Sequence, residues 1–348
     1  MNAAGLALLG ATVSTQQLPT VLVTHPGSRL RDYFGEQALV GLRNVAQVRL
    51  NASDDDLSGP GLAQAAQGCA VVIAYRQTPV DAPVLAALPD LLAVVRCAVD
   101  IRTIDVAAAS RHGILVTQAS AGFVAAVSEW IVGVMIDLSR HISAAVAAYH
   151  AVGTATPTMG RELRGAVLGI IGYGQISRYL CPVANALGMR VLVTDPHAHI
   201  QASGITQTDL EQVLTRSDYV VCLAPANADT ENLMDARAFA MMKPGAFFIN
   251  ASRGNLVDDD ALLYALDSGH LGGAALDVGR AADQMPTPAL ARHTAVIATP
   301  HIGGLTPPAI AHQALETVAQ CAELLSGRMP AGAVNAADGT RWRRWAGV

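Results

Sequence analysis

Short apolar runs alternate with longer, partly polar segments along the first third of the chain. The runs are rich in Val, Ile, Leu and Ala at successive positions, as is typical of strands buried on both faces of a parallel sheet. Their alternation with helix-length segments indicates βαβ units. Strands are predicted at Thr20–Thr24, Ala70–Ala74, Leu92–Arg96 and Ile114–Thr117, and helices at Gly35–Arg43, Gly61–Gln67, Asp81–Ala87 and Asp105–His112.

A second series of regularly spaced apolar runs begins at residue 166 and shows the same alternation. Two such series predict an α/β protein built from two units, each with a parallel sheet. Strands of the second series are predicted at Ala166–Ile171, Arg190–Thr194, Tyr219–Leu223, Ala246–Asn250, Gly273–Leu276 and Ala295–Ala298.

An Ala-rich segment between the two series, Ala125–Ala151, has the composition and length of one helix that joins two domains, and Gly153–Pro157 ends it. A final helix at about Ala309–Leu325 is predicted to return to the first domain. Residues 1–18 lack the basic start of a signal peptide and are interpreted as a loose tail. Trp342 and Trp345, among arginines at the C-terminus, are interpreted as a solvated tail end.

Composition excludes several classes of protein. The 348 residues are 51% hydrophobic and 15% charged, which excludes a largely disordered chain and suits two domains. A net charge of −5 provides no basic excess for a nucleic acid backbone. No apolar stretch reaches the roughly 18 residues of a membrane span. The five cysteines are scattered and unpaired in sequence, which predicts a reducing, cytoplasmic location and no disulfide or metal site.

A glycine-rich turn follows the strand that ends at Ile171. The pattern there is G-x-G-x-x-S, and a helix candidate comes directly after it. Gly172 permits a tight turn and Gly174 lets the backbone approach a pyrophosphate, while the amides of Gln175 and Ile176 present the positive end of the helix dipole. A lone G-x-G is weak evidence, but this strand and helix context predicts a dinucleotide site.

An acidic residue supports the same interpretation. Asp195 ends the next strand, 21 residues after Gly174, near the spacing expected in dinucleotide-binding folds. Its carboxylate would bind the ribose hydroxyls and repel a 2′-phosphate, which predicts NAD rather than NADP. An ordinary turn at Asp195-Pro196 is the alternative. Ser177, where Gly or Ala is usual, and Pro182, which should kink the helix, weaken the match.

Two polar side chains follow later strands of the second series. The strand ending at Asn250 is followed by two small residues and Arg253, which places a guanidinium at the carboxyl edge of the sheet, where ligands bind. His301 follows the last strand, between a proline and a pair of glycines. Taken alone, a surface arginine and a capping histidine are the alternatives.

With these positions in place, the sequence resembles the D-isomer-specific 2-hydroxyacid dehydrogenases, which include D-3-phosphoglycerate dehydrogenase, D-lactate dehydrogenase, glyoxylate/hydroxypyruvate reductase and formate dehydrogenase. The resemblance covers roughly Val21–Asn335. Its motifs occur in the family's order at Glu162–Gly174, Asp195-Pro196, Ser217-Asp218, Met242–Gly254, Ala274–Val278 and Thr299–Gly304.

The resemblance implies two Rossmann-like domains with the active site between them. Residues 19–118 and 309–348 would form the substrate-binding domain, and residues 119–308 the NAD-binding domain. Arg253 would hold the substrate carboxylate and carbonyl oxygen, His301 would be the acid/base, and Asp277 would contact the nicotinamide carboxamide. The cofactor would also be lined by Pro196, Ala224, Pro225, Thr230, Ala251, Ser252, Gly303 and Gly304, and the substrate carboxylate would meet the amides of Ala98 and Val99.

One departure from the family concerns the partner of the histidine. Family members usually carry a hydrogen-bonding Glu at the position of Ala282; the neighbouring Asp283 stands in place of a Pro, and a shifted loop would let it substitute. Substrate-facing segments also differ from the family's usual sequences, at Ala98–Asp100, Gln118–Phe123, Trp130 and Ala224.

We therefore expect an NAD-dependent oxidoreductase that transfers a hydride between nicotinamide and a D-2-hydroxy acid/2-oxo acid pair. The alternative is a non-catalytic NAD-binding sensor or partner-binding protein, which Ala282 favours and which Arg253 and His301 oppose. A homodimer with Ala125–Ala151 in its interface is also expected. Because only a short stretch follows His301, the regulatory domain of some phosphoglycerate dehydrogenases is not expected.

Overall fold

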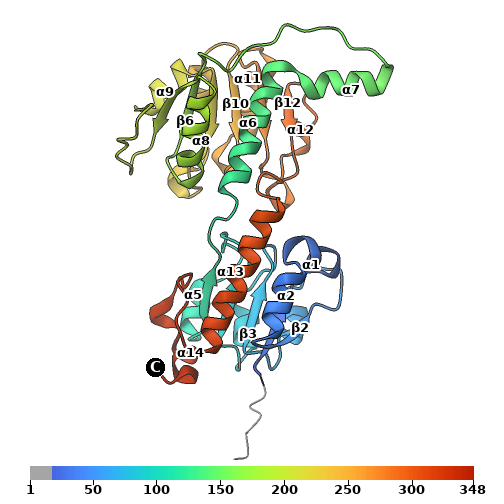
Figure 1. Ribbon diagram of the computed structural model, residues 1–348, viewed down its shortest axis with the longest axis vertical. Coiled ribbons are helices and arrows are strands. Elements are labelled where there is room, and N and C mark those ends of the chain that lie inside the picture. Colours follow the sequence, from blue (N-terminus) through green and yellow to red (C-terminus); the bar gives the residue numbers. More distant parts are fainter. Residues whose placement is uncertain (1–17) are drawn as a thin grey trace, which may run out of the picture. The chain divides into compact units, whose positions relative to one another are not determined.

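The computed structural model describes residues 18–348, apart from the side chain of Asp283. Residues 1–17, nearly all of the predicted N-terminal tail, lie outside the described part. The contacts divide the chain into two units (Figure 1). Unit 1 extends to Ser120 and resumes over Ala311–Val348, whereas unit 2 comprises Ala121–Ile310.

Unit 1 contains five parallel strands: β1 (Thr20–Val23), β2 (Gln47–Leu50), β3 (Val71–Ala74), β4 (Ala93–Arg96) and β5 (Leu115–Gln118). Their order in the sheet is β2-β1-β3-β4-β5. The inner strands β3 and β4 are buried at every position, as their apolar runs predict. The edge strand β2 is only partly buried, so its sequence, QVRL, contains no apolar run and was not predicted.

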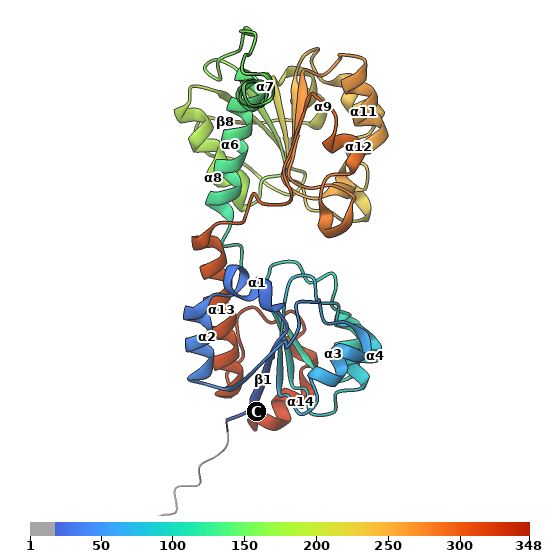
Figure 2. The same ribbon diagram turned by 90° about the vertical axis from the view of Figure 1, so that its right-hand side faces the viewer.

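Helices cover both faces of this sheet: α1 (Gly27–Tyr33), α2 (Glu36–Arg43), α3 (Gly59–Ala65), α4 (Ala82–Ala86), α5 (Val106–Arg111), α13 (Pro307–Leu325), η4 (Ala336–Asp338) and α14 (Thr340–Ala346). In Figure 2, α2 and α13 lie on one face, and α3 and α4 on the other. Leu42 of α2 shares a core cluster with Cys321 and Leu324 of α13. The final helix therefore completes the core of the first unit, as predicted.

Unit 2 contains seven parallel strands: β6 (Val167–Ile171), β7 (Arg190–Thr194), β8 (Ile205–Gln207), β9 (Tyr219–Cys222), β10 (Phe247–Asn250), β11 (Gly273–Leu276) and β12 (Val296–Ala298). Their order is β12-β11-β10-β9-β6-β7-β8. The chain runs outward from β6 to β8 and then returns to β9 on the other side of β6. The strand order therefore reverses between β6 and β9, where ligands bind in open α/β sheets.

The helices of unit 2 are α6 (Val124–Arg140), α7 (Ile142–Val152), α8 (Gln175–Ala186), α9 (Leu210–Arg216), α10 (Ala236–Met241), α11 (Asp259–Asp267) and α12 (Pro288–Ala291), with the short turns η1 (Ala228–Thr230), η2 (Gly254–Leu256) and η3 (Ala282–Gln284). Helices α6 and α8 pack on one face of the sheet, and α9, α11 and α12 on the other (Figure 2). The two parallel sheets and the discontinuous first unit confirm the predicted α/β fold class.

The predicted single helix at Ala125–Ala151 is wrong, because the segment forms two helices, α6 and α7, bent by 64°. His141, between them, adopts the left-handed conformation with φ of 55°, and its N–H donates to the carbonyl oxygen of Asp137. The Asp137 carboxylate accepts a hydrogen bond from the N–H of Ser143 (2.8 Å), at the start of α7. Composition alone does not reveal such a break.

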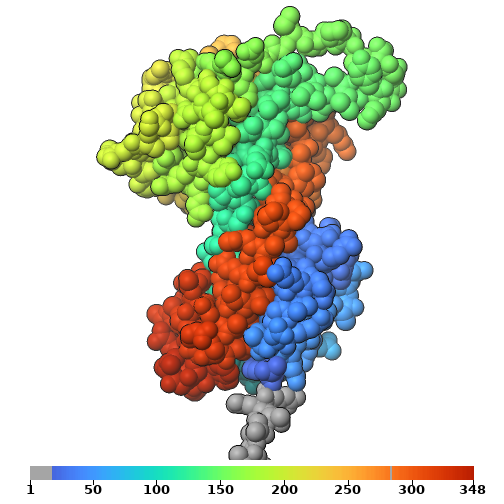
Figure 3. All heavy atoms as spheres, viewed as in Figure 1, coloured from blue at the N-terminus to red at the C-terminus, as the bar shows by residue number. Residues whose placement is uncertain are grey.

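Helix α7 has no buried residue and projects from the rest of unit 2 (Figure 3). Its exposed apolar side chains include Val146 (46% exposed) and Tyr149 (59% exposed). Among the described residues, no single helix has the length and hydropathy expected of a membrane span. The pair α6 and α7 reaches those values only when its two bent parts are joined.

The predicted solvated tail at the C-terminus is wrong for Trp342, because α14 packs onto unit 1, whereas Trp345 is 44% exposed. Trp342 is 2% exposed, and its indole Nε1 donates a hydrogen bond to the carbonyl oxygen of Leu324 (3.0 Å). The Arg341 guanidinium donates to the carbonyl oxygens of Leu88 (2.7 Å) and Pro89 (3.1 Å). Burial of a large indole with its N–H paired is favourable, and it overrides the charge of the neighbouring arginines.

Candidate active site

The predicted cofactor and catalytic residues of unit 2 all follow strands of its parallel sheet. They come after β6, β7, β9, β10, β11 and β12. Because the carboxyl ends of parallel strands meet at one edge, these residues share that edge. Its centre is the point between β6 and β9 where the strand order reverses.

Gly172 forms the turn at that point. Its φ is 98°, and a Cβ added there would lie 2.9 Å from the nitrogen of Ala224 and from the carbonyl of Leu223. Only glycine therefore lets this turn pack against the segment after β9. Gly174 differs, because a Cβ there would meet no protein atom within 4 Å. Its lack of a side chain leaves room for close approach by a ligand to the N-terminus of α8, as predicted for a pyrophosphate.

Ser177 stabilises the same turn. Its side chain is buried, and its hydroxyl donates a hydrogen bond to the carbonyl oxygen of Gly172 (2.6 Å). This serine therefore ties the first turn of α8 to the glycine turn instead of loosening the packing. Helix α8 also continues through Pro182, which lies on its exposed face.

Asp195 binds both its own turn and the glycine turn. Its Oδ2 accepts a hydrogen bond from the N–H of Tyr173 (2.7 Å), and its Oδ1 accepts from the N–H groups of His197 (2.8 Å) and Ala198 (3.0 Å). Burial acts to raise the pKa of Asp195, but these hydrogen bonds outweigh it and hold the pKa below its ordinary value. The carboxylate is therefore fixed and charged, and Oδ2 keeps one acceptor position.

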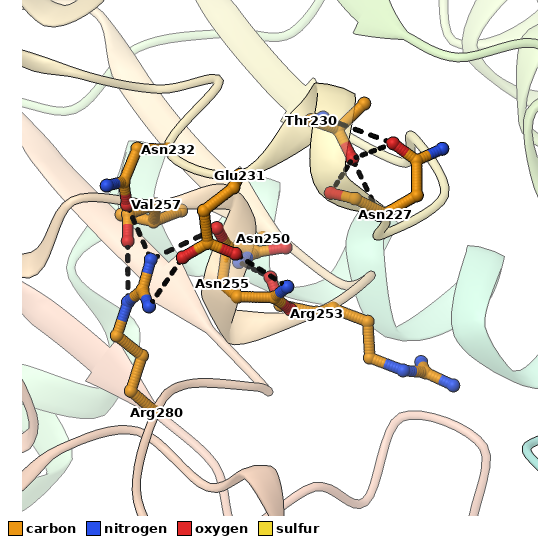
Figure 4. A network of polar contacts seen from close by, with 9 residues as sticks. All are labelled: Asn227, Thr230, Glu231, Asn232, Asn250, Arg253, Asn255, Val257 and Arg280. Atoms are coloured by element: carbon orange, nitrogen blue, oxygen red, sulfur yellow. Dashed lines mark hydrogen bonds and ion pairs between the residues drawn. The ribbon is translucent and has the colours of Figure 1, made fainter. Parts of the chain in front are cut away.

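The predicted cofactor-lining residues after β9 and β10 are joined by hydrogen bonds. The Ser252 hydroxyl donates to the carbonyl oxygen of Ala224 (2.6 Å), which lies after the neighbouring strand. The Thr230 hydroxyl donates to the carbonyl oxygen of Pro225 (2.7 Å), and Thr230 belongs to a turn capped by Asn227 (Figure 4). The first bond joins the loop after β10 to the loop after β9, and the second holds the loop after β9 in shape.

Arg253 directly precedes the turn η2, and hydrogen bonds hold the carbonyl groups of Arg253 and Ser252. The Asn250 side chain donates to the carbonyl oxygen of Arg253 (2.9 Å), and Arg253 Nη1 donates to the carbonyl oxygen of Ser252 (2.8 Å). A Cβ at Gly254 would lie 2.0 Å from the carbonyl carbon of Gly279, so the backbone after Arg253 is in direct contact with the loop after β11. The Arg253 side chain extends away from that loop (Figure 4).

Asp277 holds the loop that carries His301. Its Oδ1 accepts hydrogen bonds from the Thr299 hydroxyl (2.6 Å) and the N–H of Ile302 (2.8 Å), and its Oδ2 accepts from the N–H of Gly303 (2.7 Å). The aspartate is only 4% exposed. One buried carboxylate therefore binds the Thr299 side chain before His301 and the backbone directly after it.

His301 itself has a left-handed backbone, with φ of 56°. This conformation is unfavourable for a residue with a Cβ, and in functional sites it marks a side chain held in a required place. The three hydrogen bonds to Asp277 maintain it. The side chain is half-buried.

The remaining predicted residues follow strands of either unit or lie in η3. Ala98 and Val99 follow β4 in unit 1, where the carbonyl oxygen of Ala98 accepts a hydrogen bond from the N–H of Ala119 (3.1 Å). Ala282 is exposed in η3. The side chain of Asp283 is outside the described part, so its substitution for the family's Glu stays a prediction. Half-buried Ala251 follows β10. Pro196 follows β7, and Gly304 follows β12.

Two features were missed by the sequence reasoning. Asp277 was expected to contact only the cofactor, whereas three of its four acceptor positions bind the His301 loop. Arg280, three residues later, binds the loop after Arg253 and was not singled out. The only available signal was that Asp277, Arg280 and Thr299 are polar residues at strand ends.

The side chains that the structure describes include no group of three or more His, Cys, Asp or Glu residues able to hold a metal ion. Unit 2 instead combines a glycine turn at a reversal of strand order with an aspartate at the end of the next strand. This combination defines a dinucleotide-binding α/β protein, and an arginine and a histidine stand at the same sheet edge.

Known proteins share this sequence and fold. The model of the D-isomer specific 2-hydroxyacid dehydrogenase NAD-binding domain matches residues 132–303. An (S)-sulfolactate dehydrogenase from Chromohalobacter salexigens is 34% identical over 80% of this chain and 91% of its own length. The TT0316 protein from Thermus thermophilus matches in structure with a TM-score of 0.80 at 27% identity, over 90% of this chain and 99% of its own.

The chain belongs to the D-isomer specific 2-hydroxyacid dehydrogenase family, and the matched residues are the family's NAD-binding domain. A D-3-phosphoglycerate dehydrogenase from Synechocystis sp. is 30% identical over 96% of this chain but only 61% of its own length. The chain spans 53 to 61% of the length of this and two further phosphoglycerate dehydrogenases.

Proposed function

We propose that this protein is an NAD-dependent oxidoreductase that interconverts a D-2-hydroxy acid and its 2-oxo acid. One observation carries the proposal. Arg253 and His301 follow β10 and β12 of the NAD-binding domain, and the intervening strand β11 leads into a loop that binds the backbone beside both of them.

The two side chains have complementary roles in the proposed reaction. The Arg253 guanidinium would hold the substrate carboxylate through paired N–H groups and polarise the carbonyl oxygen. His301 would donate a proton to the developing alkoxide in reduction and accept the hydroxyl proton in oxidation. The nicotinamide supplies or accepts the hydride when the cofactor is bound.

Binding of NAD rather than NADP is supported by Asp195. Its carboxylate is held in place by three backbone N–H groups, and its pKa is below the ordinary value, so it is charged at neutral pH. A 2′-phosphate beside it would meet like-charge repulsion. Gly174 and the first amides of α8 fit the pyrophosphate, and Asp277 Oδ2 keeps one acceptor position for the carboxamide.

Unit 1 would be the substrate-binding domain, with the amides of Ala98 and Val99 toward the substrate carboxylate. We also propose a homodimer formed through α7, because its Val146 and Tyr149 side chains are exposed and the helix buries no residue within its own chain. The role of unit 1 and the dimer through α7 are both proposals about this chain's own residues.

The function is tested by initial rates of NADH oxidation with 2-oxo acids of different length and charge, and of NAD reduction with D-3-phosphoglycerate and sulfolactate. We expect turnover of at least one pair. Arg253→Ala should lower kcat/KM by about 10³-fold with NADH binding retained, and Arg253→Lys should restore little, because an ammonium lacks the planar fork. NADH binding without turnover of any acid would favour the non-catalytic alternative.

A further inference from the structure

The Arg280 guanidinium, in the loop after β11, binds two other loops at once (Figure 4). Its Nε donates to the carbonyl oxygen of Val257 (3.0 Å), and its Nη2 donates to that of Asn255 (3.0 Å). Its Nη1 donates to Glu231 Oε1 (2.9 Å), and its Nη2 also to Asn232 Oδ1 (2.5 Å). A planar group with five N–H donors is suited to such a junction, which a lysine cannot reproduce.

The partners of Arg280 are bonded to one another as well. The Asn255 side chain donates to Glu231 Oε2 (2.9 Å), and the N–H of Asn232 donates to the carbonyl oxygen of Asn255 (2.9 Å). The hydrogen bonds from Asn255 and Arg280 lower the pKa of Glu231. The network therefore joins the loop after β9 to the turn η2.

The turn η2 is the backbone that directly follows Arg253. Asn255 and Val257, whose carbonyl oxygens accept from Arg280, lie two and four residues after Arg253. The contact between Gly254 and Gly279 brings the same two loops together at the backbone. The Arg253 side chain points away from this junction, so Arg280 acts on its backbone and not on its guanidinium (Figure 4).

We propose that Arg280 is a positioning residue for Arg253, and that the segment Asp277–Arg280 sets the places of both proposed catalytic side chains. Asp277, at the start of this segment, binds the loop of His301. Arg280, at its end, binds the loop of Arg253. The inference rests on the proposed function, because the two side chains must act on one substrate carbonyl.

The test compares Arg280→Gln with Arg237→Gln in steady-state kinetics on the best 2-oxo acid. Arg237 is an exposed arginine on α10 of the same unit, so its substitution matches the change in charge. We expect Arg280→Gln to lower kcat by about 10²-fold, since small misplacements of a catalytic group have effects of this size. The Kd for NADH, measured by fluorescence, should stay within about twofold, because the glycine turn and Asp195 lie on other strands and Thr230 is held by Asn227 and Pro225 rather than by Arg280.

Arg280→Lys keeps the positive charge but lacks the planar guanidinium, and we expect it to lose most of the kcat as well. It serves as the test variant if Arg280→Gln does not fold. Equal kcat for Arg280→Gln and Arg237→Gln would overturn the proposal. A loss of NADH affinity in proportion to kcat would also overturn it, because that result indicates general damage to the domain. Absence of turnover in the unmodified protein would instead refute the proposed function.

Discussion

Two aspartates of the NAD-binding domain, Asp195 and Asp277, have similar positions after strands, but their hydrogen-bond donors lie at different distances along the chain. Each follows a buried strand of one sheet, and each carboxylate accepts three hydrogen bonds, two on Oδ1 and one on Oδ2. Two donors to Asp195 lie only two and three residues further along the chain. The donors to Asp277 lie 22 to 26 residues further along.

The difference in distance along the chain separates the proposed role in cofactor selection from the proposed role in catalysis. Asp195 is half-buried and shapes the turn after β7, so its loss should leave the distant loops in place. Asp277 is buried and connects β11 to the backbone around His301, so its loss should misplace a proposed catalytic group. Equivalent substitutions at the two positions should therefore have different kinetic effects.

Between the two aspartates, the larger effect on kcat is expected from Asp277→Asn. The amide has only one oxygen, so one or more N–H groups of the His301 loop would lose their buried acceptor, at about 1–3 kcal/mol for each unsatisfied group. We expect kcat to fall by about 10²-fold as the histidine is misplaced. Steady-state kinetics and urea unfolding measure the two effects.

Asp195→Asn is the matched control for that variant. If its kcat at saturating NADH falls as far as that of Asp277→Asn, the two aspartates do not differ in role as described.

The second effect is on cofactor choice. The unmodified protein should prefer NADH, and Asp195→Asn should reduce the ratio of kcat/KM for NADH to that for NADPH by about 10-fold, or about 1.4 kcal/mol, because like-charge repulsion is removed. Asp277→Asn should leave the ratio unchanged. A protein that uses both cofactors equally before substitution would refute the role of Asp195.

A smaller effect is expected in acid. The folded pKa of Asp195 is lowered from 3.8, so its carboxylate stabilises the folded state above that value, and the contribution is lost as the pH falls through the folded pKa. Asp195→Asn should therefore unfold with a weaker pH dependence below about pH 4. Thermal unfolding over about pH 2–6 measures this dependence, and identical slopes for the two proteins would contradict it.

Substitutions in α7 should have the smallest effect on the kinetic properties that depend on the two aspartates. Val146→Glu with Tyr149→Glu places charges in the proposed dimer interface and should give a monomer by light scattering, with the cofactor preference unchanged. If the unmodified protein is a monomer at micromolar concentration, the proposed dimer through α7 is wrong.

The sequence predicted those elements of the fold that depend on neighbouring residues in the chain. Apolar runs located the inner strands, and the glycine turn lies where the strand order reverses. The edge strands β2 and β8 lacked such runs because no residue of either strand is buried. The break at His141 was missed because it arises from one left-handed residue.

The candidate site was predictable only as a set of residues. Arg253 and His301 were found from strand ends and from the resemblance to the family. The bonds from Asp277 to the His301 loop, and from Arg280 to the turn after Arg253, join segments more than 20 residues apart. No spacing in the sequence encodes such bonds, because they depend on the order of strands in the sheet.

The central claim is that a hydride passes between nicotinamide and C2 of an acid. The most direct test incubates the protein with NADH deuterated at both C4 positions and a set of 2-oxo acids, followed by mass spectrometry and chiral separation of the products. We predict one deuterium at C2 of a D-2-hydroxy acid. Bound NADH with no label in any hydroxy acid would contradict the claim and favour a non-catalytic NAD-binding protein.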